Sequence, residues 1–279
     1  MMLFHNMMMS ANKGASWNID TAVYSTKNFT IPSPNVSPQA MTISPDGTKA
    51  YVSDANKSIY QYTFGTAFDA STLSYATKLL NTATQFGVGS SRDIRLSADG
   101  TKAYVSGLDG GSVCRVFQYT LSTPYDLSTG TYASKVLSPT VDTSIWGILF
   151  SPDGLTLFVN GLGTSKVYQY TLSTAWDIST ATYATKSYLY SAQDAQMTDM
   201  WFSPDGKKLY GIGPNTTKNI YQYTLSTAYD ISTCAYASKF FLFSGQTATP
   251  SGFAISPDGF NLYLNAAGAS AHIYQYTLK

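Results

Sequence analysis

A tetrapeptide that recurs at a nearly fixed interval constrains this chain more than any other feature. Ser-Pro-Asp-Gly, with Ala98 replacing Pro in the second copy, begins at five positions that are 52 to 54 residues apart: Ser44, Ser97, Ser151, Ser203 and Ser256. A repeat of this length, built from short strands rather than helices, is typical of a β-propeller, in which each repeat forms one blade. The sequence therefore predicts an all-β fold, a five-bladed β-propeller.

The third repeat shows why each blade should contain four antiparallel strands. An apolar run at 146–150 ends at the tetrapeptide, and runs rich in β-branched and aromatic residues follow at 157–159, 167–171 and 182–186. Pro and Gly favour the turn between the first two runs, and β-branched and aromatic residues favour strands. Four strands joined by short turns form one antiparallel blade.

The two ends of the sequence complement each other. Residues 15–27 match the hairpin and fourth strand of the repeat, whereas the last repeat stops after its third strand at 274–277. We expect residues 20–30 to pair with the blade built from residues 250–278, which closes the ring and leaves no blade unpaired at its ends.

The predicted domain organisation is an arm followed by one ring. Residues 1–14 form a Met-rich N-terminal arm, and residues 15–279 form a single propeller with blades at about 39–80, 92–138, 145–190, 197–243, and 250–279 plus 15–30. A domain of this size buries a core without a cofactor or a disulfide. We therefore expect no cofactor, and Cys114 and Cys234, at non-equivalent places in two repeats, to remain unpaired.

The charge composition bears on possible partners. The formal net charge is +1, and charged residues make up 12% of the chain. Nucleic-acid-binding proteins carry a basic patch, which is missing here. We therefore expect no nucleic-acid binding. No apolar stretch reaches 18 residues, so we also expect no membrane insertion.

The first residues stand outside the repeat and are unusually rich in Met. Unbranched Met side chains adapt to irregular surfaces and are frequent where one protein docks on another. The predicted docking residues are Met1, Met2, Leu3, Phe4, Met7, Met8 and Met9. They indicate a protein partner in a larger assembly, and the alternative is that the arm packs on its own ring.

Comparing the repeats with one another separates the scaffold from a candidate site. Most Tyr and Asp residues recur at equivalent positions and are assigned to packing and turns. One set on the innermost strands does not recur: Arg92, Asp93, Arg95, Trp146, Asp199 and Trp201. A structural ion pair that fills the channel is the favoured interpretation, because buried charges must be paired. A ligand pocket is the alternative, and the loops that differ between repeats, all on the opposite end from the tetrapeptide, are further candidates for recognition.

The residue inventory offers little for catalysis. All 16 acidic residues are Asp, and the two His residues, His5 and His272, are far apart in the sequence. A glycosidase would have to use Asp93 with Asp199, and no zinc ligand set is evident. The sequence-based expectation is a protein that is not an enzyme and binds no metal.

Two segments of the repeat resemble known propeller families. Ser-Pro-Asp-Gly followed by Leu-Tyr, as in 203–210 and 256–264, resembles the repeats of lactonase-like and surface-layer propellers. Tyr-Gln-Tyr-Thr-Leu-Ser-Thr-Ala-Trp/Tyr-Asp-Ile-Ser-Thr, as in 168–180 and 221–233, resembles repeats of phage and bacterial surface or virion proteins. The blade count also resembles that of tachylectin-type lectins. The likeness covers residues 15–279 and transfers no catalytic residue.

These observations predict a non-enzymatic structural or adhesion protein on a virion, such as a phage capsid or tail, or on a cell surface. The arm would dock the ring, and the variable loops would face outward. One alternative is a carbohydrate-binding lectin that uses Trp146 or Trp201. Another is a hydrolase that uses Asp93 and Asp199 facing the channel.

Overall fold

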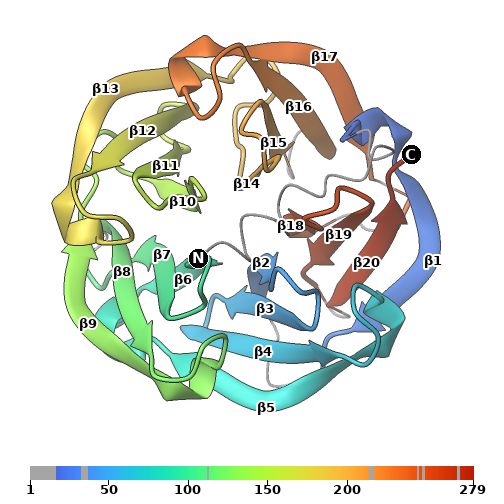
Figure 1. The fold of residues 1–279 in the computed structure, drawn as a ribbon, viewed down its shortest axis with the longest axis horizontal. Helices are drawn as coiled ribbons and strands as arrows, with labels where there is room; N and C mark the ends of the chain where they lie inside the picture. The colour runs from blue at the N-terminus through green and yellow to red at the C-terminus, as the bar shows by residue number, and fades with distance from the viewer. Residues whose placement is uncertain are drawn as a thin grey trace.

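Five sheets surround a central axis in the computed structural model, which describes residues 17–32, 37–111, 113–213, 217–243, 245–246, 249–268 and 271–279. Figure 1 shows them as the blades of a ring, and each described sheet contains four antiparallel strands. The predicted five-bladed propeller with four-stranded antiparallel blades is therefore confirmed.

The strands of each blade run from the axis to the rim in chain order, apart from the strand that closes the ring (Figure 1). Blade 1 contains β2 (Pro38–Ile43), β3 (Lys49–Asp54), β4 (Ser58–Phe64) and β5 (Leu73–Asn81). Blade 2 contains β6 (Ser90–Leu96), β7 (Lys102–Leu108), β8 (Cys114–Leu121) and β9 (Gly130–Leu137). Blade 3 contains β10 (Ile145–Phe150), β11 (Thr156–Gly161), β12 (Lys166–Leu172) and β13 (Ala181–Leu189). Blade 4 contains β14 (Asp199–Phe202), β15 (Lys208–Gly213), β16 (Asn219–Leu225) and β17 (Cys234–Leu242).

Blade 5 joins the two ends of the chain. It contains β18 (Pro250–Ile255), β19 (Asn261–Ala266), β20 (His272–Thr277) and, at the rim, β1 (Val23–Thr30). β1 and β20 are antiparallel, with Phe29 opposite Ile273. The structure thus agrees with the predicted closure of the ring by the N-terminal strand.

Helical structure in the described residues is limited to short turns. Single 3-10 turns precede the outer strands: η1 (Ile19–Thr21), η2 (Ala70–Thr72), η3 (Leu127–Thr129), η4 (Ile178–Thr180) and η5 (Ile231–Thr233). One short helix, α2 (Ala83–Phe86), lies between blades 1 and 2. No described helix is long and apolar enough to cross a membrane.

The Ser-Pro-Asp-Gly turn is held by its own side chains and by an aromatic ring. In the first copy the Ser44 hydroxyl donates to Asp46 at 2.6 Å and accepts from the Lys49 amide at 2.9 Å. Gly47 has φ +68°, and a Cβ there would lie 2.4 Å from the ring of Phe68. The equivalent rings on the other turn glycines are Tyr125 on Gly100, Trp176 on Gly154, Tyr229 on Gly206 and Trp17 on Gly259. The glycine is therefore required by both its backbone conformation and the close approach of the ring.

The hydrophobic core lies between blades rather than within any one of them. One buried cluster, for example, combines Val116 of blade 2 with Ile148 and Val159 of blade 3. Each blade therefore contributes apolar side chains to both of its neighbours, and burial of this surface holds the ring together.

A glutamine from the third strand of each blade bonds to the backbone of the next blade. Its side-chain oxygen accepts from an amide of the neighbouring 3-10 turn at 2.8 to 3.1 Å. The pairs are Gln61 with Leu127, Gln118 with Ile178, Gln169 with Ile231, Gln222 with Ile19 and Gln275 with Ala70. The repeated Tyr-Gln-Tyr sequence thus encodes the contact between blades.

A lysine–aspartate pair repeats the same blade-to-blade connection nearer the rim. The pairs are Lys27–Asp69, Lys78–Asp126, Lys135–Asp177, Lys186–Asp230 and Lys239–Asp20, at 2.5 to 3.3 Å. In the outer strand, a bulge before the lysine contains a residue with positive φ, such as Thr77 at 57° before Lys78. Bulges re-aim side chains and disrupt an exposed strand edge, so this one serves both purposes.

Replacing one of the bridging glutamines tests their contribution to stability. Gln169→Leu leaves the Ile231 amide buried without its acceptor, and we expect the free energy of unfolding to fall by about 1 to 3 kcal/mol. Equilibrium urea denaturation measures the change. Gln193→Leu, the same replacement on a half-buried loop residue whose side chain bridges no blades, is the matched control and should be close to neutral. Equal losses in the two variants would contradict the assigned role.

Candidate functional site

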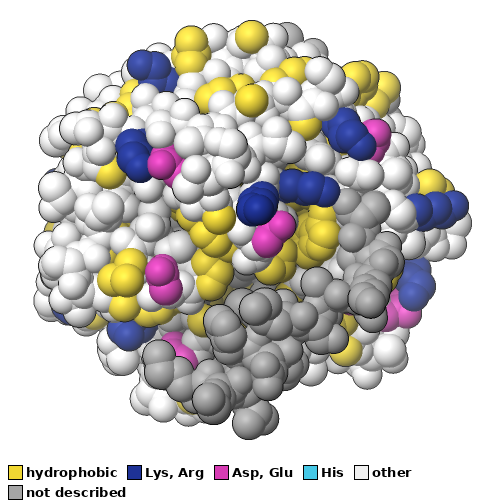
Figure 2. Space-filling model, turned by 45° about the horizontal axis from the view of Figure 1, so that its top comes forward, with side chains coloured by type: hydrophobic (Ala, Val, Ile, Leu, Met, Phe, Trp, Pro, Cys, Tyr) yellow, Lys and Arg dark blue, Asp and Glu magenta, His cyan; other side chains and the backbone are white. Residues whose placement is uncertain are grey.

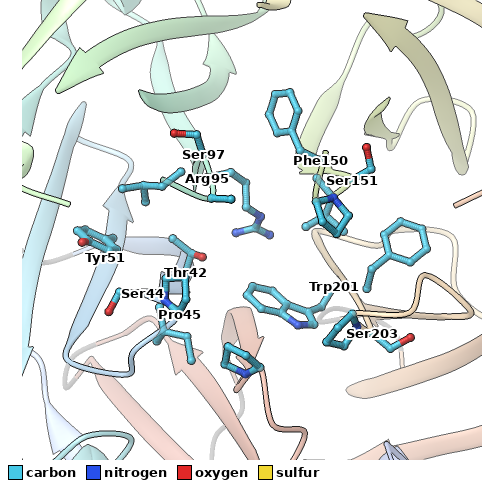
Figure 3. A pocket seen from close by; sticks show the side chains of 18 of the residues that line it. Thr42, Ser44, Pro45, Tyr51, Arg95, Ser97, Phe150, Ser151, Trp201 and Ser203 are labelled. Carbon is cyan, nitrogen blue, oxygen red and sulfur yellow. The ribbon is translucent and has the colours of Figure 1, made fainter. Parts of the chain in front are cut away.

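A cavity of about 200 Å³ opens on the axis at the end of the ring that carries the Ser-Pro-Asp-Gly turns. We call it the axial pocket (Figure 3). Its rim repeats from blade to blade and includes Pro45, Ala98, Pro152, Pro204 and Pro257. The rim is therefore built mainly from the scaffold itself.

The floor of the axial pocket does not repeat. Four innermost strands each contribute the residue two positions before the turn serine: Thr42 from β2, Arg95 from β6, Leu149 from β10 and Trp201 from β14. In Figure 3 the labelled Thr42, Arg95 and Trp201 converge on the middle of the ring. The deepest part of the pocket is therefore asymmetric, because each of these blades contributes a different side chain to it.

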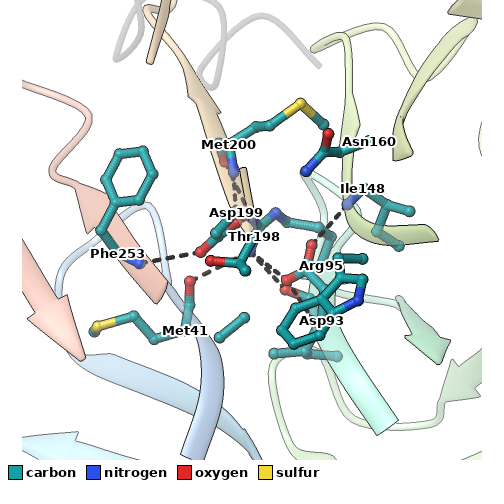
Figure 4. A network of polar contacts seen from close by, with 12 residues as sticks. Met41, Asp93, Arg95, Ile148, Asn160, Thr198, Asp199, Met200 and Phe253 are labelled. Carbon is teal, nitrogen blue, oxygen red and sulfur yellow. Dashed lines mark hydrogen bonds and ion pairs between the residues drawn. The ribbon is translucent and has the colours of Figure 1, made fainter. Parts of the chain in front are cut away.

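Arg95, which forms part of this floor, lies between the buried carboxylates of Asp93 and Asp199, which do not line the pocket (Figure 4). Its Nη1 is 2.8 Å from Asp93 Oδ1, and its Nη2 is 2.5 Å from Asp199 Oδ1. The guanidinium also donates to the backbone oxygens of three innermost-strand residues: Met41 at 3.2 Å, Ile94 at 3.0 Å and Met200 at 3.1 Å. We call Asp93, Arg95 and Asp199 the axial plug.

The two aspartates of the axial plug also connect neighbouring blades. Asp93 Oδ2 accepts from the Ile148 amide of blade 3 at 2.8 Å. Asp199 Oδ2 accepts from the Phe253 amide of blade 5 at 3.0 Å. Each Oδ1 accepts from the amide that follows it in its own strand. The carboxylates thus supply acceptors to amides at the axis, and Arg95 compensates for their charge.

Electrostatics keep the arginine charged. Burial alone would lower the pKa of Arg95, but Asp93 and Asp199 together raise that pKa above its ordinary value. Burial raises the pKa of Asp93, with a further contribution from the charge of Asp199, although Arg95 acts in the opposite direction. Burial also raises the pKa of Asp199. The net charge of the axial plug is therefore −1 with both aspartates ionised and zero when one of them holds a proton.

The six candidate residues do not form a single site. Arg92 and Trp146 stack on each other, with the guanidinium carbon 4.6 Å from the ring centroid, and Arg92 donates to the Ile145 oxygen at 2.6 Å. Neither is among the residues that line the axial pocket, whereas Arg95 and Trp201 are. Of the two tryptophans named for the lectin alternative, only Trp201 therefore lines the axial pocket.

The axial pocket lies among the repeated turns. Recognition was predicted on the opposite end of the ring, among the variable loops, and that stays a prediction. Sequence comparison singled out Arg95 and Trp201 but left Thr42 and Leu149 out of the candidate set. Thr42 and Leu149 lie two residues before the turn serine of their repeats, as Arg95 and Trp201 do. Their position in the repeat, rather than their residue type, was the signal that could have identified them.

The hydrolase hypothesis expected Asp93 and Asp199 to face the channel, but both side chains are buried. Their exposed fractions are 1% and 0%, and all four carboxylate oxygens accept hydrogen bonds from the protein. A substrate cannot reach either group, because neither faces open space. Elsewhere in the described residues, no group of three or more His, Cys, Asp or Glu side chains could hold a metal ion. The predicted docking residues Met1 to Met9 lie outside the described part of the chain.

Comparison of the chain with known proteins supports the fold. No family model and no curated protein matches the sequence. A putative 6-phosphogluconolactonase from Bacteroides uniformis has a TM-score of 0.51 and 16% identity, over 89% of this chain and 68% of that chain. A luciferin-regenerating enzyme has a TM-score of 0.56 and 11% identity, over 92% and 95%. Regucalcin from Agrobacterium tumefaciens, a calcium-binding protein, has a TM-score of 0.52 and 12% identity, over 88% and 93%.

These neighbours correct one prediction and bear only partly on another. The prediction that this chain is not an enzyme was wrong to exclude catalysis. Two of the neighbouring propellers are named as a 6-phosphogluconolactonase and a luciferin-regenerating enzyme. The resemblance to propeller proteins holds at the level of fold. The more specific likeness to phage and bacterial surface repeats is not confirmed.

Removing the cation of the axial plug tests its electrostatic role. Arg95→Met leaves two buried carboxylates uncompensated, and we expect the free energy of unfolding at pH 8 to fall by about 3 to 5 kcal/mol. In this variant the folded pKa values of Asp93 and Asp199 exceed the unfolded value of about 3.9, so the folded state binds the extra proton. Stability should therefore increase as the pH is lowered from 8 to 5.

Urea denaturation at both pH values measures this effect. Lys135→Met, which removes a cation from a half-exposed pair at the rim, is the control and should cost at most about 1 kcal/mol. If Arg95→Met does not fold, the double variant with Asp199→Asn should recover folded protein. A stability of Arg95→Met that is independent of pH would contradict the assignment.

Proposed function

We propose that this protein is a structural or adhesion ring, carried on a virion such as a phage capsid or tail or on a cell surface, that recognises a ligand through its axial pocket. The observation that carries the proposal is an open pocket with a strand-specific floor, in a ring whose glutamine and lysine–aspartate contacts repeat from blade to blade. A site that differs where the scaffold is uniform is where recognition is expected.

The frame suits a protein that must bind without changing shape. Every blade is connected to the next by a buried glutamine and a lysine–aspartate pair. The floor residues lie on the innermost strands, whose backbone groups are bonded by the axial plug. A preorganised site loses little conformational entropy when it binds.

The surface suits recognition by shape rather than by long-range attraction. The formal net charge is +1 for 279 residues. On the face seen in Figure 2, Lys, Arg and Asp side chains are scattered, and no patch of a single sign dominates. A dispersed charge pattern gives little electrostatic steering, so affinity would depend on contacts inside the pocket.

The Met-rich residues 1–14 are proposed to be the anchor of the ring, on the basis of their composition alone. Deleting residues 1–12 should abolish incorporation into particles or attachment to the cell surface and leave the ring folded. Immunogold labelling of the native source measures attachment, and circular dichroism of the purified variant measures folding. Unchanged incorporation would contradict the anchor, and a protein found only away from particles and surfaces would contradict the proposed location.

Obstructing the rim tests the pocket. Ala98 is half-buried at the only rim position where the turn lacks proline, so Ala98→Trp should fill the mouth without disturbing the core. We expect it to reduce adhesion of the displayed ring to its target at least tenfold, counted as bound particles or cells. Ala98→Pro, which restores the repeated residue, is the matched control and should bind as the unmodified protein does. Full adhesion by Ala98→Trp would contradict recognition through this pocket, and glycan-array binding that Ala98→Trp abolishes would favour the lectin alternative.

A further inference from the structure

We infer that the axial pocket takes a small, uncharged, mainly apolar molecule of about one aromatic ring, with a single hydrogen-bonding group, and that it rejects anions although an arginine forms part of its floor. This inference rests on the proposed role of the pocket in recognition and specifies the chemistry of the ligand. It follows from counting which polar groups of the pocket are still available.

Arg95 has no N–H to offer. Its Nη1 and Nη2 donate to Asp93, Asp199 and the backbone oxygens of the axial plug described above. Its Nε has no partner in the described structure and is inaccessible to solvent. A carboxylate or phosphate in the pocket would therefore meet the guanidinium without forming the in-plane bonds by which arginine recognises anions.

The charge beneath the floor also opposes an anion. Asp93 and Asp199 bring two carboxylates within 2.8 Å of one guanidinium. The plug is therefore negative when both aspartates are ionised and neutral when one of them is protonated. The Cζ of Arg95 also lies 5.6 Å from the centroid of the Trp201 ring, so the face of that ring attracts the guanidinium as well.

The hydroxyl groups in the wall are already occupied. The serines at 44, 97, 151 and 203 each donate to the aspartate of their own turn and accept from a backbone amide. The hydroxyl of Tyr51 donates to the Tyr125 oxygen, and that of Tyr229 donates to the Pro204 oxygen. A sugar, with a hydroxyl on most of its carbons, would lose its hydration without finding enough partners.

Two polar side-chain groups remain on the floor, and the indole N–H groups of Trp17 and Trp176, which line the wall, also take part in no hydrogen bond within the described structure. Within the described structure, neither the Thr42 hydroxyl nor the Trp201 indole N–H takes part in a hydrogen bond, and both residues line the pocket. Leu149 and the prolines of the rim supply apolar surface around them. This combination fits a ring that carries one hydroxyl or N–H group.

The volume sets the size of the ligand. At about 200 Å³ the pocket is smaller than the roughly 300 to 1,000 Å³ of typical sites for drug-sized ligands. It is somewhat larger than the cavity of about 150 Å³ that accommodates benzene. A single substituted aromatic ring is therefore the appropriate size.

Four probes with similar dimensions separate the possibilities. Phenol is uncharged, benzoate is an anion, benzylamine is a cation, and methyl glucoside is a neutral polyol. We expect saturation-transfer NMR with the full chain to show phenol binding at least tenfold more tightly than benzoate and methyl glucoside, and more tightly than benzylamine. Ala98→Trp should abolish phenol binding, and Ala98→Pro should retain it.

Thr42→Val tests the polar anchor. Replacing the hydroxyl by a methyl group of the same shape should weaken phenol binding about two- to tenfold, as expected for the loss of one hydrogen bond. Binding of toluene, which has no hydroxyl, should be unchanged or slightly stronger. Equal effects on both compounds would show that the hydroxyl is not the anchor and would overturn that part of the inference.

The outcomes distinguish this inference from the proposed function. Tighter binding of benzoate, benzylamine or the glucoside, sensitive to Ala98→Trp, would overturn the ligand class and leave recognition through the pocket intact. Binding of none of the four probes would also overturn the ligand class. Full adhesion by Ala98→Trp would overturn the proposed function itself.

Discussion

The ring depends on one interaction, the hydrogen bond from a turn amide of one blade to the glutamine oxygen of the preceding blade. It is buried, it occurs at each of the five junctions, and it involves the first residue of the 3-10 turn each time. Each of these 3-10 turns precedes an outer strand, and the lysine of that strand pairs with an aspartate of the next blade. Because every junction uses the same parts, each blade is at once a donor and an acceptor, and the arrangement is complete only as a closed circle.

The sequence was sufficient to predict the fold because the repeat has a fixed period and because the match at 15–27 supplied the missing strand. It did not reveal that Gln169 bonds to a different blade, because the spacing of residues within one repeat does not show which residues of adjacent blades they contact. It also grouped Arg92 with Arg95, although the two lie at different parts of the axis. That grouping rested on both residues being non-recurrent, and a register shift between Ser91 and Asp93 changes how Arg92 is placed in the strand.

The axial plug shows how residue type alone can mislead. Arg95 and its two aspartates have the composition of an anion site or of a catalytic pair, yet their donors and acceptors are consumed by the scaffold. The same reasoning limits the opposite conclusion. A short inventory of acids and histidines does not exclude catalysis, and propellers of similar shape include proteins named as enzymes. Function resides in the site and not in the fold.

The closing strand has a consequence for biosynthesis. Ser25 on β1 bonds to Gln275 on β20, a separation of 250 residues. β1 therefore leaves the ribosome long before its partner exists, and blade 5 cannot be completed until nearly all of this chain has been synthesised. Pairing over such a distance is slow, since a large loop must close first. Until that moment β1 has no sheet to join, and an unpaired strand edge is a template for pairing with another chain.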